Sequence, residues 1–287
     1  MRALSLFSGI GGLDLAAEWA GIETAAFCEY ADFPRKVLSK HWPDVPIYKD
    51  IRNLNKKVLL KDGVIDRDKT IGLVHGGFPC QPYSSAGKQK GKEDDRDLWP
   101  EMYRIVKEIG PDWVVGENVA NFANMELDRT LFNLESEGYS TTAFVLPACG
   151  VDAKHQRFRT FIVAHSSGER HVFGKLEELA AEAWEQTFTD TIESCNIFHN
   201  SDSFGWQTDD VPSRVVETRE RNGQFSTTNR ASGRWPAEPR VGRVANGIPN
   251  RVDRIGSLGN AVVPQQAFPI FTAIMEIERM LGNDKDT

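Results

Sequence analysis

The feature that most constrains the fold is an alternation of short apolar runs with amphipathic helical patterns, which continues from residue 3 to about residue 165. "ALSLF", "IETAAFC", "IGLVHGG", "DWVVGEN", "STTAFVLPA" and "TFIVAH" have the length and apolar content of buried strands. "LDLAAEWAG", "FPRKVLSKHW", "LWPEMYRIVKEIG" and "LDRTLFNLESEG" have helical periodicity, and all but the second end in glycine. This alternation predicts βαβ units, and therefore an α/β fold whose mainly parallel sheet has helices on both faces.

The alternation stops after His165, and the chain divides into three predicted regions. Residues 1–168 hold the strand and helix patterns, and residues 169–250 are polar apart from the helix-like stretch "GKLEELAAEAWEQTF". Residues 251–287 contain the apolar helical pattern "PQQAFPIFTAIMEIERML", which we expect to pack back onto the first region. A chain of 287 residues is long enough for one large domain and a smaller one.

Charge is distributed unevenly along the chain. The formal net charge is −7, which argues weakly against a polyanionic partner. Between Arg214 and Arg254, however, nine arginines face only four acidic residues, so that this stretch has an excess of five positive charges. Such a stretch is typical of a surface that binds nucleic acid, and an ordinary solvated loop explains it equally well.

Cysteine usage and hydropathy indicate an intracellular protein. Cys28, Cys80, Cys149 and Cys195 are widely spaced and form no zinc-like pattern with histidine, so we expect free thiols and no metal site. No apolar run approaches the roughly 20 residues that a membrane span requires, and the N-terminal stretch reaches glycine too soon for a secretory signal.

A glycine-rich loop, "LFSGIGGLD", joins the first predicted strand to the first helix. Gly9, Gly11 and Gly12 would let the backbone approach a ligand, although a tight structural turn explains them equally well. Glu29 follows the next predicted strand, and Asp50, in "YKDI", could follow a third, where an acidic residue can hold ribose or an adenine amino group. Each acid alone could be a solvated loop residue; all these positions together favour an adenosine-containing cofactor.

A thiol and a carboxyl group are expected at the same edge of the sheet. Cys80 stands where an apolar run ends, and it is an inert surface thiol unless a partner stabilises its thiolate. Glu117 follows apolar "WVVG", so burial should raise its pKa and let it act as an acid. Arg157 and Arg159, at the start of a strand, suit a carbonyl oxygen or phosphates, or they could simply pair with nearby acids.

Seven motifs together resemble one enzyme family. "LFSGIGGLD", "CEYADFP", "KDI", "GGFPCQPYSSAGKQKG", "GENV", "QRFR" and "LGNAVVP", in this order and spacing, resemble the cytosine-5 DNA methyltransferases, particularly the short bacterial and phage enzymes. The resemblance covers residues 1 to about 165 and 256 to 281, and nothing comparable covers 170–240. His155 stands where many relatives have glutamine, with Gln156 beside it, so that no role is assigned to either.

The resemblance implies S-adenosylmethionine as the methyl donor. Phe7 would stack on the adenine, Gly9 and Gly11 would admit the methionine part, Glu29 would hold the ribose and Asp50 the adenine amino group. The full set that it implies for the cofactor is Phe7, Gly9, Ile10, Gly11, Gly12, Glu29, Tyr30, Asp50, Ile51, Pro79, Asn260 and Val262.

The resemblance also implies a covalent mechanism on a cytosine flipped out of duplex DNA. Cys80 would add to carbon 6, protonated Glu117 would contact ring nitrogen 3, and Arg159, with Arg157 beside it, would hold the cytosine carbonyl or a phosphate. Residues 1–168 would be the catalytic and cofactor-binding domain, and 169–250 the target-recognition region. The loop "QPYSSAGKQKGKEDDR" would be a lid, or else a solvated charged loop. DNA contacts are expected from Gln81, Ser84, Ser85, Lys88, Lys90, Arg96, Arg230, Arg234, Arg240 and Arg243.

Expectations about partners follow from the same family. We expect a monomer in the cytoplasm of a bacterial or phage-infected cell, with any cognate restriction endonuclease acting separately. The alternatives are a related enzyme acting on transfer RNA, a DNA-binding relative without catalysis, and a nicotinamide-dependent enzyme with a catalytic thiol. The nicotinamide-dependent enzyme would require the third glycine of the dinucleotide fingerprint, which this sequence lacks.

Overall fold

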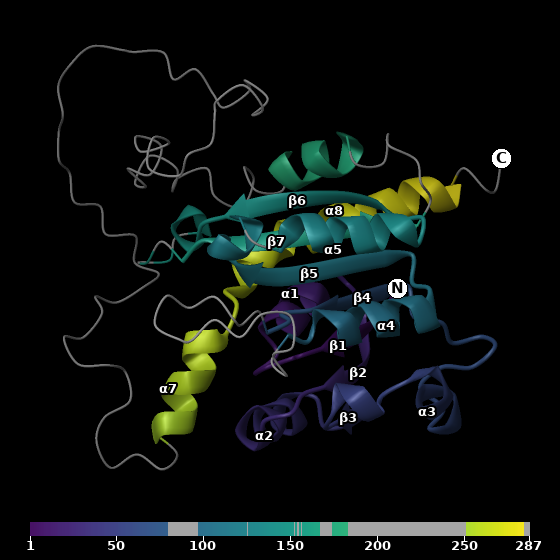
Figure 1. Ribbon diagram of the computed structural model, residues 1–287, viewed down its shortest axis with the longest axis vertical. Coiled ribbons are helices and arrows are strands. Elements are labelled where there is room, and N and C mark those ends of the chain that lie inside the picture. The colour runs from purple at the N-terminus through teal and green to yellow at the C-terminus, as the bar shows by residue number, and fades with distance from the viewer. Residues whose placement is uncertain are drawn as a thin grey trace.

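The computed structural model describes residues 1–79, 97–124, 126–151, 153, 155, 157–166, 174–182 and 251–283. These residues contain a seven-stranded sheet with strand order β3-β2-β1-β4-β5-β7-β6 (Figure 1). β7 is antiparallel to both β5 and β6, and the other neighbours are parallel, which confirms the predicted mainly parallel sheet. The strands are β1 (Arg2–Leu6), β2 (Glu23–Cys28), β3 (Ile47–Tyr48), β4 (Leu73–Gly76), β5 (Trp113–Val119), β6 (Ser140–Leu146) and β7 (Arg159–His165).

The predicted helices form where their periodicity placed them. Gly110 ends α4 in the left-handed conformation, with φ 65°, and Gly21 and Gly138 adopt φ above 80° just after α1 and α5. The helices are α1 (Gly12–Trp19), α2 (Asp32–His41), α3 (Lys56–Lys61), α4 (Trp99–Ile109), α5 (Leu127–Ser136), residues 174–182, α7 (Arg251–Asn260) and α8 (Pro264–Asn283), with 3-10 turns η1 (Ile51–Asn53), η2 (Ala120–Asn124) and η3 (Ala148–Val151). None of the described helices is long and apolar enough to cross a membrane.

The sheet has a hydrophobic core on each face, because side chains alternate along its strands. On β5, Val114 points into the core formed with α4 and α5, whereas Trp113 and Val115 point into the core formed with α1 and α8. α8 packs against α1, as the apolar pattern of "PQQAFPIFTAIMEIERML" predicted. The limits of the three predicted regions stay predictions, since residues 183–250 lie outside the described part of the chain.

The topology brings the predicted site residues to one edge of the sheet. β1, β2, β3, β4 and β5 run parallel, so their carboxyl ends meet at that edge. β7 runs the other way, and Arg159, its first residue, pairs with Val119, the last residue of β5. The loops after the parallel strands and the start of β7 therefore surround a common space, where ligands bind in open α/β sheets.

Under this edge lies a fully buried ionisable pair. His75 Nε2 on β4 is 3.6 Å from Asp14 Oδ1 on α1, and neither side chain is exposed. Burial raises the pKa of Asp14 to about 7, although Ser5 and Thr24 act against the shift, and burial lowers the pKa of His75 to about 4. At neutral pH the folded protein therefore keeps the imidazole uncharged.

We predict that His75→Gln removes the part of the pH dependence of the unfolding free energy that comes from this histidine. The pKa of His75 is lower in the folded protein, about 4, than in the unfolded chain, 6.5. His75 therefore contributes its full stabilisation of the fold above pH 6.5 and loses that contribution as the pH falls toward 4. The deficit of His75→Gln relative to wild type should thus grow as the pH rises from 4 to 6.5. Urea unfolding at several pH values measures it, and a deficit independent of pH would contradict the assignment.

Candidate active site

The conformation of the loop between β1 and α1 is set by residues with left-handed backbone geometry and by hydrogen bonds to Glu29. Phe7, Gly9 and Gly11 have φ of 52°, 56° and 86°, and Phe7 keeps this conformation although it has a side chain. Glu29 Oε2 accepts a hydrogen bond from the Gly9 amide at 2.8 Å, and Oε1 accepts one from the Ala31 amide at 2.7 Å. The acid at the end of β2 therefore lies directly against the glycine loop, as its spacing predicted.

The segment before α8 packs against this loop. A Cβ atom on Gly12 would lie 2.7 Å from the backbone oxygen of Val262, so only glycine lets the segment before α8 come this close. Val262 is half-buried there, whereas Asn260, at the end of α7, is exposed. The two regions predicted to share the cofactor, separated by some 250 residues in sequence, are thus adjacent in space.

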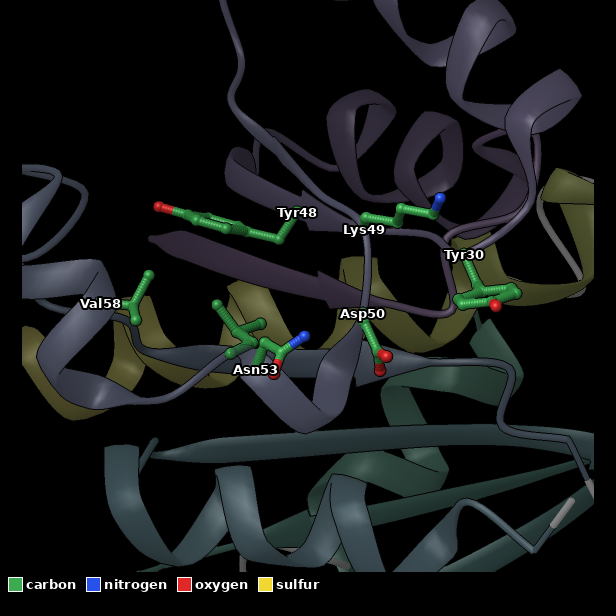
Figure 2. A pocket seen from close by; sticks show the side chains of 7 residues that line it. Tyr30, Tyr48, Lys49, Asp50, Asn53 and Val58 are labelled. Atoms are coloured by element: carbon green, nitrogen blue, oxygen red, sulfur yellow. The ribbon is translucent and has the colours of Figure 1, made fainter. Parts of the chain in front are cut away.

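A pocket of about 430 Å³ extends from Tyr30 along the loop after β3 (Figure 2). Asp50 lies on its wall, where its carboxylate also accepts a hydrogen bond from the Arg52 amide at 3.0 Å and so begins η1. The side chain of Ile51 packs in the buried core and is not among the residues that line the pocket, and its predicted contact with the cofactor stays a prediction. The pocket is lined by Tyr30, Tyr48, Lys49, Asp50, Asn53, Leu54 and Val58.

Glu117 is a buried carboxyl group beside an arginine. It lies within β5, two residues before the end of the strand, and 8% of its side chain is exposed. Arg159 Nε is 2.7 Å from Oε1, as an ion pair whose alignment is not that of a hydrogen bond. Burial raises the pKa of Glu117 to about 7, against the opposing effects of Arg159 and Arg157. The carboxyl group can therefore carry a proton near neutral pH.

The segment that leads to Cys80 is fixed by Asn118, the residue after Glu117. Phe78 is buried among the rings of Trp99 and Phe122, and its carbonyl accepts a hydrogen bond of 3.0 Å from Asn118 Nδ2. Asn118 was quoted within "GENV" but given no role; its side chain holds the backbone just before Pro79. Pro79 is exposed at the end of this segment.

Arg157 and Arg159 point at different partners. The Arg157 guanidinium donates hydrogen bonds to the carbonyls of Gly259 and Ala261, at 2.7 and 2.6 Å, which flank Asn260. The backbone carbonyl of Arg157 accepts a bond from the buried side chain of Gln266, which the sequence analysis missed. Arg157 therefore holds the segment before α8, while Arg159 faces the acid.

The remaining predicted residues fall into two groups. Ile10 is half-buried in the glycine loop and His155 is exposed before β7. Outside the described residues lie the predicted nucleophile, Gln156 and every predicted DNA contact: Cys80, Gln81, Ser84, Ser85, Lys88, Lys90, Arg96, Gln156, Arg230, Arg234, Arg240 and Arg243.

We predict that Gly77→Ala damages the site without replacing any of its functional side chains. An added Cβ would lie 2.8 Å from Glu117 Oε2, so the buried carboxyl group must move away from its position beside Arg159. Turnover at this site should fall by about tenfold or more, the equivalent of roughly 1.4 kcal/mol. The matched control is Gly282→Ala, where the new methyl group meets nothing within 4 Å. Equal turnover in the two variants would contradict the arrangement.

The mixed sheet with helices on both faces bears out the predicted S-adenosylmethionine-dependent methyltransferase fold. The family model of C-5 cytosine-specific DNA methylases matches residues 1–235, and the chain belongs to that family. It is 32% identical over 186 residues to the Type II methyltransferase M.AquIA of Picosynechococcus sp., covering 60% of this chain and 75% of that protein.

Two further relatives match a similar share of the chain. The Type II methyltransferase M.HhaI of Haemophilus parahaemolyticus is 34% identical over 168 residues, covering 57% of this chain and 48% of that protein. M.FnuDI of Fusobacterium nucleatum is 36% identical over 169 residues, covering 57% and 46%. The chain thus spans about half the length of these two relatives.

Proposed function

We propose that this protein transfers a methyl group from S-adenosylmethionine to carbon 5 of a cytosine flipped out of duplex DNA. The observation that supports it best is the buried Glu117 beside Arg159, at the edge of the sheet where Phe78 and Pro79 lead into Cys80. Membership of the C-5 cytosine-specific DNA methylase family supports the same reaction. The names of the relatives support a restriction-modification setting.

The residues at the sheet edge fit the cofactor. At Gly9 an added Cβ would meet nothing within 4 Å, so the loop leaves open space there, and glycine at position 12 lets Val262 pack against the loop. Glu29 would hold the ribose, Asp50 the adenine amino group, and Tyr30 would cover the ring from the mouth of the pocket. When bound, the cofactor supplies an electrophilic methyl group.

The mechanism that we propose overcomes the poor nucleophilicity of carbon 5. The Cys80 thiolate adds to carbon 6, and the electron pair of the 5,6 double bond becomes available at carbon 5. Protonated Glu117 stabilises the developing charge by a hydrogen bond to ring nitrogen 3, and Arg159 holds the carbonyl oxygen. After methylation, loss of the proton on carbon 5 expels the Cys80 thiolate and restores the double bond.

Turnover should depend on the protonation of Glu117. Because the acid form is required and the pKa is raised to about 7, the rate at saturating cofactor should fall as the pH rises above about 7. Arg159 lowers this pKa, so Arg159→Gln should move the alkaline limb to higher pH in addition to slowing the reaction. The pH profiles of the two enzymes measure the shift, and an unmoved limb would exclude Glu117 as its source.

Transfer of labelled methyl groups to different nucleic acids tests the function. Purified protein is incubated with the labelled donor and either duplex DNA or transfer RNA. We expect label on cytosine in DNA alone, and label on transfer RNA alone would favour the related RNA enzyme. Binding of the donor with no transfer to either would instead indicate a relative without catalysis.

A further inference from the structure

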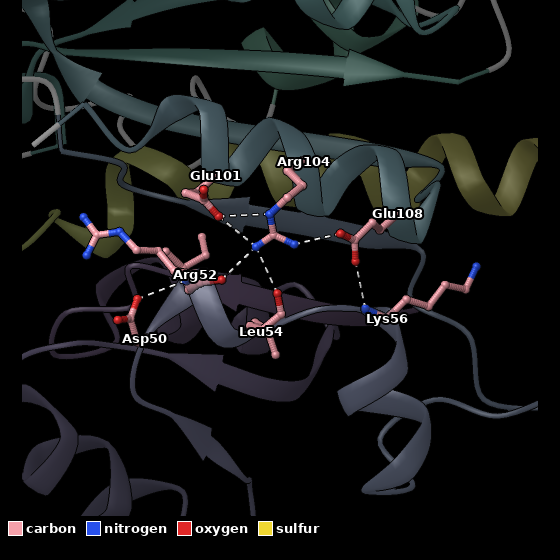
Figure 3. A network of polar contacts seen from close by, with 8 residues as sticks. Asp50, Arg52, Leu54, Lys56, Glu101, Arg104 and Glu108 are labelled. Carbon is pink, nitrogen blue, oxygen red and sulfur yellow. Dashed lines mark hydrogen bonds and ion pairs between the residues drawn. The ribbon is translucent and has the colours of Figure 1, made fainter. Parts of the chain in front are cut away.

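Arg104, on α4, holds the turn that forms one wall of the pocket (Figure 3). Its Nη2 atom donates hydrogen bonds to the carbonyls of Ile51 and Leu54, at 2.8 and 3.0 Å. These carbonyls lie at the two ends of η1. Arg104 reaches them from helix α4, some 50 residues further along the chain. One side chain therefore spans the whole turn.

The turn needs such a partner because it is only three residues long. The Ile51 carbonyl also accepts a hydrogen bond of 3.1 Å from the Leu54 amide, but the Leu54 carbonyl lies past the end of the turn and has no partner within it. Leaving that carbonyl unpaired would cost free energy. Asp50 closes the start of η1 through the Arg52 amide, and Arg104 closes its end. Asp50, Asn53 and Leu54 all line the pocket, so both ends of the turn fix the pocket wall.

Two acids hold the guanidinium in place. Glu101 accepts from Nε and Nη2, at 2.9 and 2.8 Å, and Glu108 accepts from Nη1 at 2.8 Å. Glu108 also accepts a bond of 3.0 Å from the Lys56 amide at the start of α3. Only the planar fork of arginine can serve two carboxylates and two carbonyls at once.

We propose that Arg104 is a positioning residue for the adenosine end of the cofactor site. It touches neither the cofactor nor the reacting atoms; it fixes Asp50, Asn53 and Leu54 so that the pocket is formed before the cofactor binds. This inference rests on the proposed use of S-adenosylmethionine. It assigns cofactor affinity to a residue outside the pocket.

Cofactor binding by Arg104→Met and Arg104→Lys tests the proposal. Calorimetry with S-adenosylmethionine should show affinity reduced about tenfold or more in Arg104→Met, since ordering the turn then opposes binding. Turnover at saturating cofactor should stay within about threefold of wild type, giving a higher KM with a similar kcat. Arg104→Lys keeps the charge but should recover little of the affinity. A merely structural role would instead lower the folded fraction and leave KM unchanged.

The control is Arg279→Met, which removes an exposed ion pair with Glu276 on α8, where Arg279 is 66% exposed. It should bind the cofactor like wild type. Wild-type affinity in Arg104→Met would overturn the proposal; if that variant does not fold, wild-type affinity in Arg104→Lys would do so. Failure of the wild-type protein itself to bind S-adenosylmethionine would overturn the proposed function instead.

Discussion

Cys80→Ala should abolish methyl transfer while leaving S-adenosylmethionine binding within about twofold of wild type. Without the thiolate no bond forms at carbon 6, and carbon 5 keeps the low reactivity of free cytosine. Nothing else in this scheme adds to carbon 6, so the rate should fall to the background of the assay. Labelled methyl incorporation into duplex DNA measures the loss, and calorimetry measures cofactor binding in the same preparation.

The matched control is Cys149→Ala. Cys149 is a free, buried thiol in η3, just after β6, and it has no role in the proposed reaction, so its loss tests for any effect of removing a thiol as such. It should retain turnover. Full activity in Cys80→Ala would end the covalent mechanism, whatever the behaviour of the control.

Glu117→Gln should reduce turnover by about 10²–10⁴-fold, the usual contribution of a positioned acid. The amide has nearly the same shape as the carboxyl group but cannot deliver a proton to the developing charge on ring nitrogen 3. Because glutamine keeps the shape of the acid and its amide oxygen can still face Arg159, folding and cofactor affinity should persist. Single-turnover methylation of duplex DNA measures the rate.

Glu276→Gln, which changes a surface acid on α8 paired with Arg279, is the control for this substitution. It should be indistinguishable from wild type. If Glu117→Gln kept more than about a tenth of the wild-type rate, the carboxyl group would not be the acid of the reaction.

Most of the fold follows from local sequence patterns. Alternation of apolar runs with helical periodicity predicted the strands and the longer helices, because burial on two faces leaves a continuous apolar signal. Glu29, Asp50 and Glu117 could be placed at one edge for the same reason, since the ends of parallel strands meet there. In the structure Glu29 bonds to the glycine loop and Asp50 lines the pocket.

The features that escaped prediction depend on tertiary contacts. Arg157 and Arg159 are two residues apart and were expected to act together, but Arg157 has φ 31°, outside strand geometry, and turns to the carbonyls around Asn260. α7 was missed because Gly256 and Gly259 reduce its helix propensity. Arg104 gave no signal at all, since its partners lie about 50 residues earlier in the chain.

Bisulfite sequencing of DNA from cells that express the protein tests the central claim most directly. The host should lack cytosine methylation of its own, and a parallel culture should express Cys80→Ala. We predict cytosines protected from conversion in one recurring sequence context, with wild-type protein only. Complete conversion in both cultures, although the protein is folded and binds S-adenosylmethionine, would contradict methylation of cytosine in DNA.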